Sequence, residues 1–152
     1  MREIDTILKD ILKCQGFKLK GTSWYRLTDD FIHVINFQKS LYSNLYYVNI
    51  GIDKKTGNVK SYKPEYKFAI RLRIERLITD KALLQALDFN DNISVFDRLE
   101  LLSKIVKYSI DFLDSLSNWE QLKLSLSDPK HPINKAAIIA TMRSEIENLQ
   151  DG

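Results

Sequence analysis

The hydropathy pattern is clearest in two long runs near the middle of the chain, residues 31–40 and 45–52. Both runs are rich in β-branched and aromatic residues, which favours β-strands, and the short segment 41–44 between them predicts an antiparallel hairpin. Because side chains alternate between the two faces of a strand, one row of the second strand should face the core. That row is uniformly apolar: Tyr46, Val48, Ile50 and Ile52.

Further elements lie on both sides of this hairpin. Apolar residues at helical spacing predict a helix over residues 3–14, which Gly16 should end in the left-handed conformation. Shorter strands are predicted at residues 17–20 and 23–27. Residues 53–64 contain turn-forming residues and should connect the hairpin to the next strand.

Residues 66–75 show a strict period of two, which predicts a strand with one buried and one cationic face. Arg71 and Arg73 should share the cationic face, opposite Phe68, Ile70 and Leu72.

From residue 79 onward the apolar positions recur at helical spacing. We predict a short helix up to residue 87, a long helix after Ser94, a third over 119–126 and a last one over 135–149, capped by Asn134. The long helix should bury its apolar positions, which are Phe96, Leu99, Leu102, Ile105, Val106, Ile110 and Leu113.

Strands and helices thus occupy separate parts of the chain, which is typical of the α+β class rather than of a wound parallel sheet. We predict one globular domain over residues 1–152. In it, an antiparallel meander within about residues 17–76 packs against the N-terminal helix and the C-terminal helices. No strand is expected after Ser94.

Composition and charge narrow the function classes only slightly. The 152 residues are 44% hydrophobic and 28% charged, and the net charge of +3 is too small to indicate nucleic-acid binding by itself. No run approaches the roughly 20 apolar residues of a membrane span, and the charged N-terminus is unlike a secretory signal. The single cysteine, Cys14, is expected to be a buried thiol, and the cytoplasm is the expected location.

No motif indicates catalysis, a metal site or phosphate binding. His33 and His131 are the only histidines, which argues against a zinc or iron site, and no cofactor is expected. The Lys-Lys-Thr-Gly stretch at 54–57 lacks the second glycine of a P-loop. An enzyme would need a general base, for which Asp29 or His33 are the best candidates, and neither has a recognisable partner in the sequence. His33 is expected to be a core or half-buried histidine.

Polar residues in otherwise apolar strands form a candidate site. It comprises Asn36, Gln38, Ser40, Asn49, Arg71 and Arg73. A buried unpaired amide costs on the order of 1–3 kcal/mol, so the amides must find partners. They either bond one another and Arg73, which would fix the strand register, or line a concave face that receives the polar groups of a partner.

Short motifs also carry a family resemblance, in the segments Cys14–Gly21, Trp24–Arg26, Asn36–Ser40 and Tyr47–Ile52. They resemble the bacterial domain-of-unknown-function family 4304. Its members have Gly-Phe followed by basic residues, an aromatic pair, Gln-Lys-Ser at a strand end and Asn-aliphatic-Gly in a strand. Glu75 stands where the family has glycine, and Asp111 where it has proline, which leaves open whether the long helix breaks there.

The resemblance implies no established activity, although some similar small bacterial families lie beside toxins as immunity proteins. We favour a non-enzymatic binding protein of the immunity or accessory type that holds another protein on one sheet face. Aromatic residues suit such an interface and are expected to be exposed at Trp24, Tyr42, Tyr47 and Tyr62. The alternatives are nucleic-acid or anion binding through the basic strand Lys67–Arg76 and an enzyme of unknown class.

Overall fold

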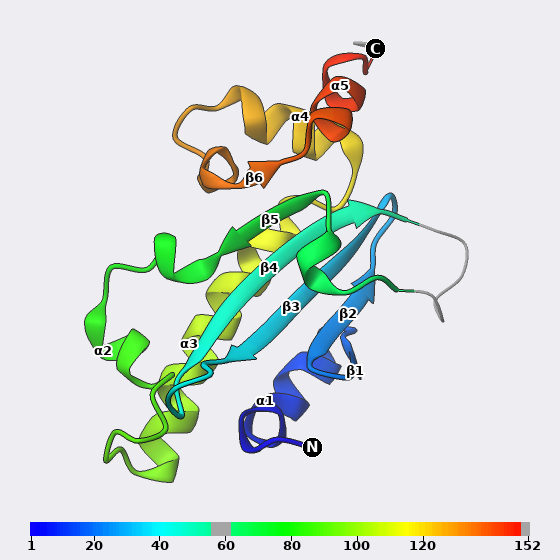
Figure 1. The fold of residues 1–152 in the computed structure, drawn as a ribbon. Coiled ribbons are helices and arrows are strands. Elements are labelled where there is room, and N and C mark those ends of the chain that lie inside the picture. The colour runs from blue at the N-terminus through cyan, green and yellow to red at the C-terminus, as the bar shows by residue number, and fades with distance from the viewer. Residues whose placement is uncertain (56–61, 150–152) are drawn as a thin grey trace.

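The structure is a computed structural model that describes residues 1–55 and 62–149. Its centre is a six-stranded antiparallel sheet whose strands follow one another in chain order (Figure 1). The strands are β1 (Lys18–Lys20), β2 (Ser23–Leu27), β3 (Phe31–Lys39), β4 (Tyr46–Lys54), β5 (Ile70–Arg73) and β6 (Ala137–Ile138). The predicted α+β class is confirmed.

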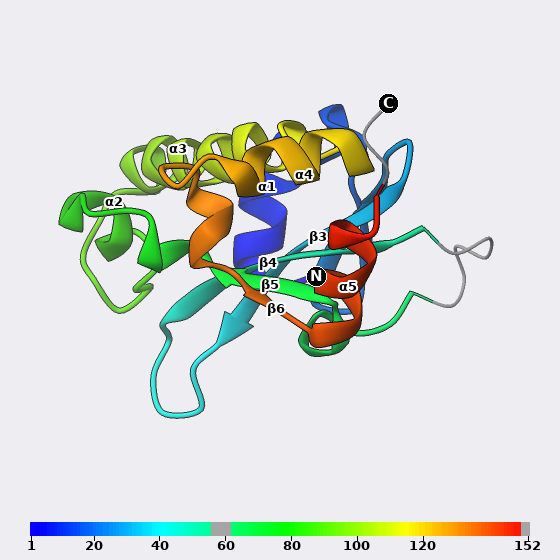
Figure 2. The ribbon, with the colours of Figure 1, turned by 90° about the horizontal axis from the view of Figure 1, so that it is seen from above.

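Helices precede and follow the sheet. They are α1 (Glu3–Cys14), α2 (Lys81–Gln85), α3 (Val95–Asp114), α4 (Trp119–Ser127) and α5 (Ala140–Glu147), with short 3₁₀ turns η2 (Glu65–Lys67), η3 (Ile74–Arg76) and η4 (Pro132–Lys135). Helices α1 and α3 cover one face of the sheet, and α4 and α5 lie near its β6 edge (Figures 1 and 2). In the described part of the chain, no helix combines the length and the apolar content that crossing a membrane requires.

Side chains cap the N-termini of α3 and α4. Ser94 Oγ accepts a hydrogen bond from the Asp97 amide at 3.1 Å, and Asn118 Oδ1 accepts one from the Gln121 amide at 2.8 Å. At the end of α1, Gly16 has φ +85°, the left-handed conformation expected of a C-terminal cap. Helix α3 continues through Asp111 without a break and ends at Asp114.

The core lies between the sheet and helices α1 and α3. The predicted inward row of β4 is buried along its whole length, as is the neighbouring row of β3 that contains Phe31, His33, Ile35 and Phe37. Helix α1 adds Ile4, Leu8 and Leu12, and α3 adds Leu102, Ile105 and Val106.

A partly buried ion pair between Arg2 and Asp5 fixes α1 to the sheet. Asp5, only 1% exposed, accepts hydrogen bonds from Arg2 Nε at 2.8 Å and from Trp24 Nε1 at 3.0 Å. Arg2 also donates to the Phe37 carbonyl oxygen at 2.6 Å. Trp24 is therefore fully buried, and the expectation that it is exposed is wrong.

The predicted strand over residues 66–75 is shorter in the structure, because the 3₁₀ turns η2 and η3 flank the four residues of β5. Arg71 and Arg73 do lie on the face opposite Ile70 and Leu72. The prediction for Phe68 is wrong: the chain bends at residue 69, which resets the alternation. Phe68 consequently packs on the same side as the arginines, against Tyr25, Ile32 and Val34.

The pairing of β5 with β4 ends at Arg73, and the Glu75 side chain takes over as hydrogen-bond acceptor for the next part of β4. Its carboxylate accepts from the Val48 amide at 3.1 and 3.4 Å, so a side chain satisfies a backbone donor beyond the end of β5. Burial raises the pKa of the Glu75 carboxyl above its ordinary value, while the Val48 amide and the charge of Arg73 oppose that shift.

The predicted helix over residues 135–149 begins only at Ala140. Before it, β6 pairs with β5 through Ile70↔Ile138, and the expectation of no strand after Ser94 is wrong. The β-branched pair Ile138–Ile139 suits this role, since an edge strand such as β5 has unpaired backbone groups that a short strand can satisfy. Asn134 lies within η4, and its side chain donates to the Asp128 carbonyl oxygen at 2.8 Å.

Three burial predictions also fail. Cys14 is exposed at the end of α1, and Phe96 and Leu99 of α3 are 74% and 40% exposed. At the start of α3 the buried position belongs to Arg98, which donates to the carbonyl oxygens of residues 86, 88 and 91. Residues 56–61 of the predicted connection lie outside the described residues.

Replacing Gly51 by alanine should destabilise the fold. A Cβ atom there would lie 2.7 Å from Val34 Cγ1 and 2.9 Å from Phe68 Cδ2, so two packed side chains would have to move. We expect the free energy of unfolding to fall by about 1–3 kcal/mol in chemical denaturation. An unchanged unfolding midpoint would contradict this packing.

Candidate functional site

The candidate residues lie on the face of the sheet that points away from α1 and α3, here called the outer face. It faces the viewer in Figure 1 and carries the segment from residue 62 to residue 69 near one end. The register places Asn36 of β3 opposite Asn49 of β4, and Asn49 opposite Arg73 of β5. Three strands therefore bring polar side chains that are distant in the sequence into one row.

These side chains form a continuous hydrogen-bond network. Asn49 Nδ2 donates to Asn36 Oδ1 at 3.1 Å and to Gln38 Oε1 at 2.9 Å. Arg73 donates from Nε to Asn49 Oδ1 at 3.2 Å and from Nη2 to Gln38 Oε1 at 3.3 Å. Asn36 Nδ2 continues the network to Ser23 Oγ at 2.9 Å.

Exposure divides the network into two parts. Asn49 is 5% exposed and Asn36 is half-buried, so they act as a register device within the sheet. Gln38 and Arg73 are exposed at the surface of the same network. The inner amides thus bond one another across the strands, while Gln38 and Arg73 of the same network face solvent.

Arg73 is held in place from two sides. Its guanidinium carbon lies 4.4 Å from the centroid of the Tyr47 ring, a cation–π distance. Its hydrogen bonds to Asn49 and Gln38 use two of the five N–H groups of a guanidinium. Arg73 is therefore exposed and ordered at once.

The remaining candidates are placed differently. Arg71 forms an ion pair with Glu65, with Nε 3.0 Å from Oε1. Ser40 lies in the turn between β3 and β4, where its Oγ accepts from the Tyr42 amide at 3.2 Å. Arg71 thus lies on the same face as Arg73, whereas Ser40 belongs to the turn and is not part of the row.

An open groove of about 820 Å³, here called the outer groove, lies over these residues. Its lining includes Lys20, Asn36, Gln38, Glu65, Arg71 and Arg73. Three of these side chains are cationic and one is a carboxylate, so the groove favours an anionic partner group. Lys20 and Glu65 could not be foreseen as site residues, because only tertiary packing brings the end of β1 and η2 beside the row of Arg71 and Arg73.

The two candidate bases for an enzyme lie in different environments. His33 is fully buried, with Nε2 2.9 Å from the Leu116 carbonyl oxygen and Nδ1 3.2 Å from Arg26 Nε. Burial lowers the pKa of His33 to about 4, with a smaller contribution in the same direction from the charge of Arg26. Asp29 is exposed in the turn before β3.

Among residues 1–55 and 62–149, no group of three or more histidine, cysteine, aspartate or glutamate side chains could hold a metal ion.

One family matches the sequence: its description is a domain of unknown function (DUF4304), and the match covers residues 8–115. The chain belongs to this family. No curated protein and no solved structure matches the chain. The DUF4304 match includes β1 to β5 and α3, so the whole row of outer-face residues lies within the family region. Gly51 lies against Val34 and Phe68 on this face.

Removing the inner amide should destabilise the sheet more than removing the outer one. Asn49→Ala deprives Asn36, Gln38 and Arg73 of a partner at a buried position, and we expect a loss of about 1–3 kcal/mol in the free energy of unfolding. Gln38→Ala acts where water can replace the amide and should change it by about 0.5 kcal/mol or less. Chemical denaturation of both variants tests this, and equal losses would refute the division of the network.

Acidification should destabilise the protein through His33. The folded state holds the imidazole neutral, whereas the unfolded chain binds a proton near pH 6.5, so the free energy of unfolding should fall as the pH drops from 6.5 to about 4. The full effect of this shift is about 3 kcal/mol. Denaturation at several pH values and an NMR titration of the His33 ring measure it. A ring that titrates near pH 6.5 in the folded protein would contradict the buried neutral state.

Proposed function

We propose that this chain is a non-enzymatic binding protein, of the immunity or accessory type, that holds another protein against the outer groove. The observation that carries the proposal is Arg73, an exposed guanidinium held by Tyr47 and by two amides. Arginine and tyrosine are enriched among the residues that dominate protein interfaces. A side chain that is ordered before binding loses little conformational entropy in the complex.

The chemistry of the groove points to an acidic surface on the partner. Arg73 has guanidinium N–H groups beyond the two that bond the amides, and a carboxylate can accept two of them side by side. Glu65 offsets part of the charge of Arg71, with which it is paired. Arg73 is therefore the centre of the proposed contact, with Gln38 beside it.

A nucleic acid is the second candidate for this region. Tyr66 is 65% exposed, and the Lys67 ammonium lies 6.0 Å from its ring centroid, so a base could stack beside a positive charge. Two features weaken this alternative: the segment Lys67–Arg76 is not one continuous strand, and the charge of Arg71 is partly neutralised by Glu65.

We place the protein in the cytoplasm of a bacterium. The exposed thiol of Cys14, the single cysteine of the chain, suits a reducing compartment.

Charge reversal at Arg73 should abolish partner binding without unfolding the protein. Wild-type protein and the variants Arg73→Glu and Lys104→Glu would be tagged, cross-linked in lysate of the source organism and compared by mass spectrometry. We expect one partner to be enriched by the wild type and by the Lys104→Glu control, because Lys104 is exposed on α3. With that partner purified, Arg73→Glu should weaken binding by at least about tenfold.

Equal capture by Arg73→Glu, or no enriched protein, would refute the proposal. Thermal melts of all variants ensure that loss of binding is not loss of fold. Tight binding of a short single-stranded RNA at low salt, weakening steeply as salt is added, would instead support the nucleic-acid alternative.

A further inference from the structure

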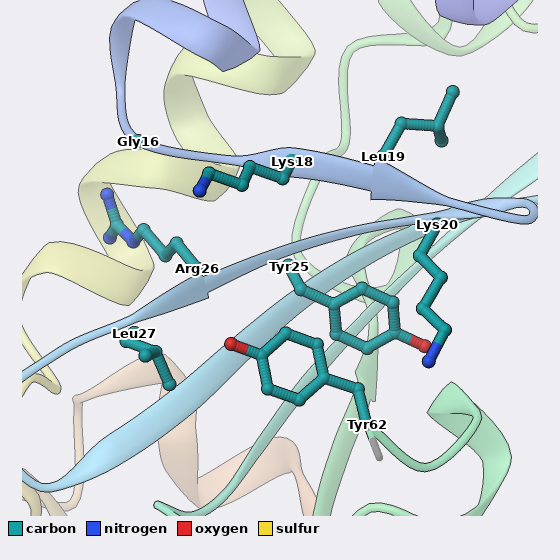
Figure 3. Close-up of a pocket in the computed structure, with 8 residues that line it drawn as sticks. All are labelled: Gly16, Lys18, Leu19, Lys20, Tyr25, Arg26, Leu27 and Tyr62. Atoms are coloured by element: carbon teal, nitrogen blue, oxygen red, sulfur yellow. The ribbon is translucent and has the colours of Figure 1, made fainter. Parts of the chain in front are cut away.

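A second hollow, here called the edge pocket, lies at the β1–β2 end of the outer face (Figure 3). It has a volume of about 620 Å³, and its lining includes Lys18, Lys20, Tyr25, Leu27 and Tyr62. This volume is within the range of sites that hold small organic molecules. Lys18 and Leu27 line the edge pocket and do not line the outer groove, so the two sites can be tested separately.

One wall of the edge pocket is aromatic. The rings of Tyr25 and Tyr62 pack with their centroids 5.0 Å apart at an angle of 39°. Tyr25 is fixed, since it is 5% exposed and its hydroxyl donates to the Lys63 carbonyl oxygen at 3.1 Å. Burial raises the pKa of the Tyr25 hydroxyl, which keeps this donor protonated. Tyr62 is only half-buried and thus offers ring surface to a ligand.

Aliphatic surface continues this wall. Leu27, the last residue of β2, is 40% exposed and extends toward the same side as Tyr62 (Figure 3). Contact between Leu27 and a flat hydrocarbon ring would remove apolar surface from water and so stabilise the complex.

The charged residues of the pocket are all cationic. Lys18 and Lys20 extend from the two ends of β1 (Figure 3), and the register pairs Lys18 with Tyr25, which places both lysines on the outer face. Arg26 also contributes to the lining, but its guanidinium donates to His33, Gln15 and Asp114. Among the residues that the structure describes, no aspartate or glutamate lines the pocket, and Lys18 forms no ion pair.

We propose that the edge pocket binds a small planar aromatic molecule that carries one carboxylate. The ring lies against Tyr62 and Leu27, and the carboxylate meets the ammonium group of Lys18. An aromatic body fits the tilted tyrosine pair better than a flexible chain does, because stacked rings gain contact without losing rotatable bonds. Binding of this molecule requires no protein partner, although the edge pocket shares Lys20, Tyr25 and Tyr62 with the outer groove.

The probe for this proposal is 2-naphthoate, titrated into the ¹⁵N-labelled full chain and followed by NMR. We expect saturable shifts at the amides of residues 18–20 and 25–27, with a Kd of about 0.1–1 mM for a ligand of this size. Lys18→Glu should weaken binding by about tenfold, because it replaces an attraction by a repulsion. Leu27→Ser should weaken it by about threefold through lost apolar contact.

Arg73→Glu is the matched control, since Arg73 lines only the outer groove, and its Kd for 2-naphthoate should stay within about twofold of the wild type. Neutral 2-naphthamide and aliphatic decanoate should each bind at least about fivefold more weakly. If 2-naphthamide bound as tightly as 2-naphthoate, the proposed role of the carboxylate would be refuted. If decanoate bound more tightly than 2-naphthoate, the proposed preference for an aromatic ring would be refuted. Shifts that do not saturate, or an unchanged Kd in Lys18→Glu, would remove the site.

Discussion

The register between β3 and β4 is the constraint on which the rest of the structure depends. The two strands pair over nine residues, with Asn36 opposite Asn49 near the middle of the outer face. A shift by one residue would turn the row of Tyr46, Val48, Ile50 and Ile52 away from the core and would bury the amides instead. The hydrogen bond between the two asparagines therefore stabilises the same register that hydrophobic burial selects.

The outer face becomes a surface with two hollows because the chain after β4 returns over it. Asp53 links this return segment to the sheet: its carboxylate accepts from the Ala69 amide at 3.1 Å and pairs with Lys63 at 2.7 Å. Phe68 then packs against Gly51 and Val34, while Tyr62 packs on Tyr25. Tyr25 and Tyr62 line both hollows. The segment thus covers the apolar part of the face and leaves the polar row of Gln38 and Arg73 open to solvent.

His33 and Glu75, two titratable groups with shifted pKa values, hold parts of the fold together. His33 hydrogen-bonds the Leu116 carbonyl oxygen, and Glu75 accepts from the Val48 amide. In the described part of the chain, every buried side-chain nitrogen or oxygen has a hydrogen-bond partner. The groups that line the two hollows include ammonium and guanidinium cations, amides and aromatic rings.

The sequence by itself determined the elements whose signals are local. Period-two and helical spacing predicted α1, the hairpin of β3 and β4, and the starts of α3 and α4, because capping side chains and alternating rows act over a few residues. It also indicated that Asn36, Gln38 and Asn49 could share a face with Arg73.

Tertiary structure decided the rest, since no local pattern encodes which distant segments meet. It placed Phe68 on the outer face, added β6 to the edge of β5, put Arg98 rather than Phe96 in the buried position of α3, and left Cys14 exposed. The hollows exist for the same reason, because they form where the segment beginning at Tyr62 packs on earlier strands, as Tyr62 does on Tyr25 of β2.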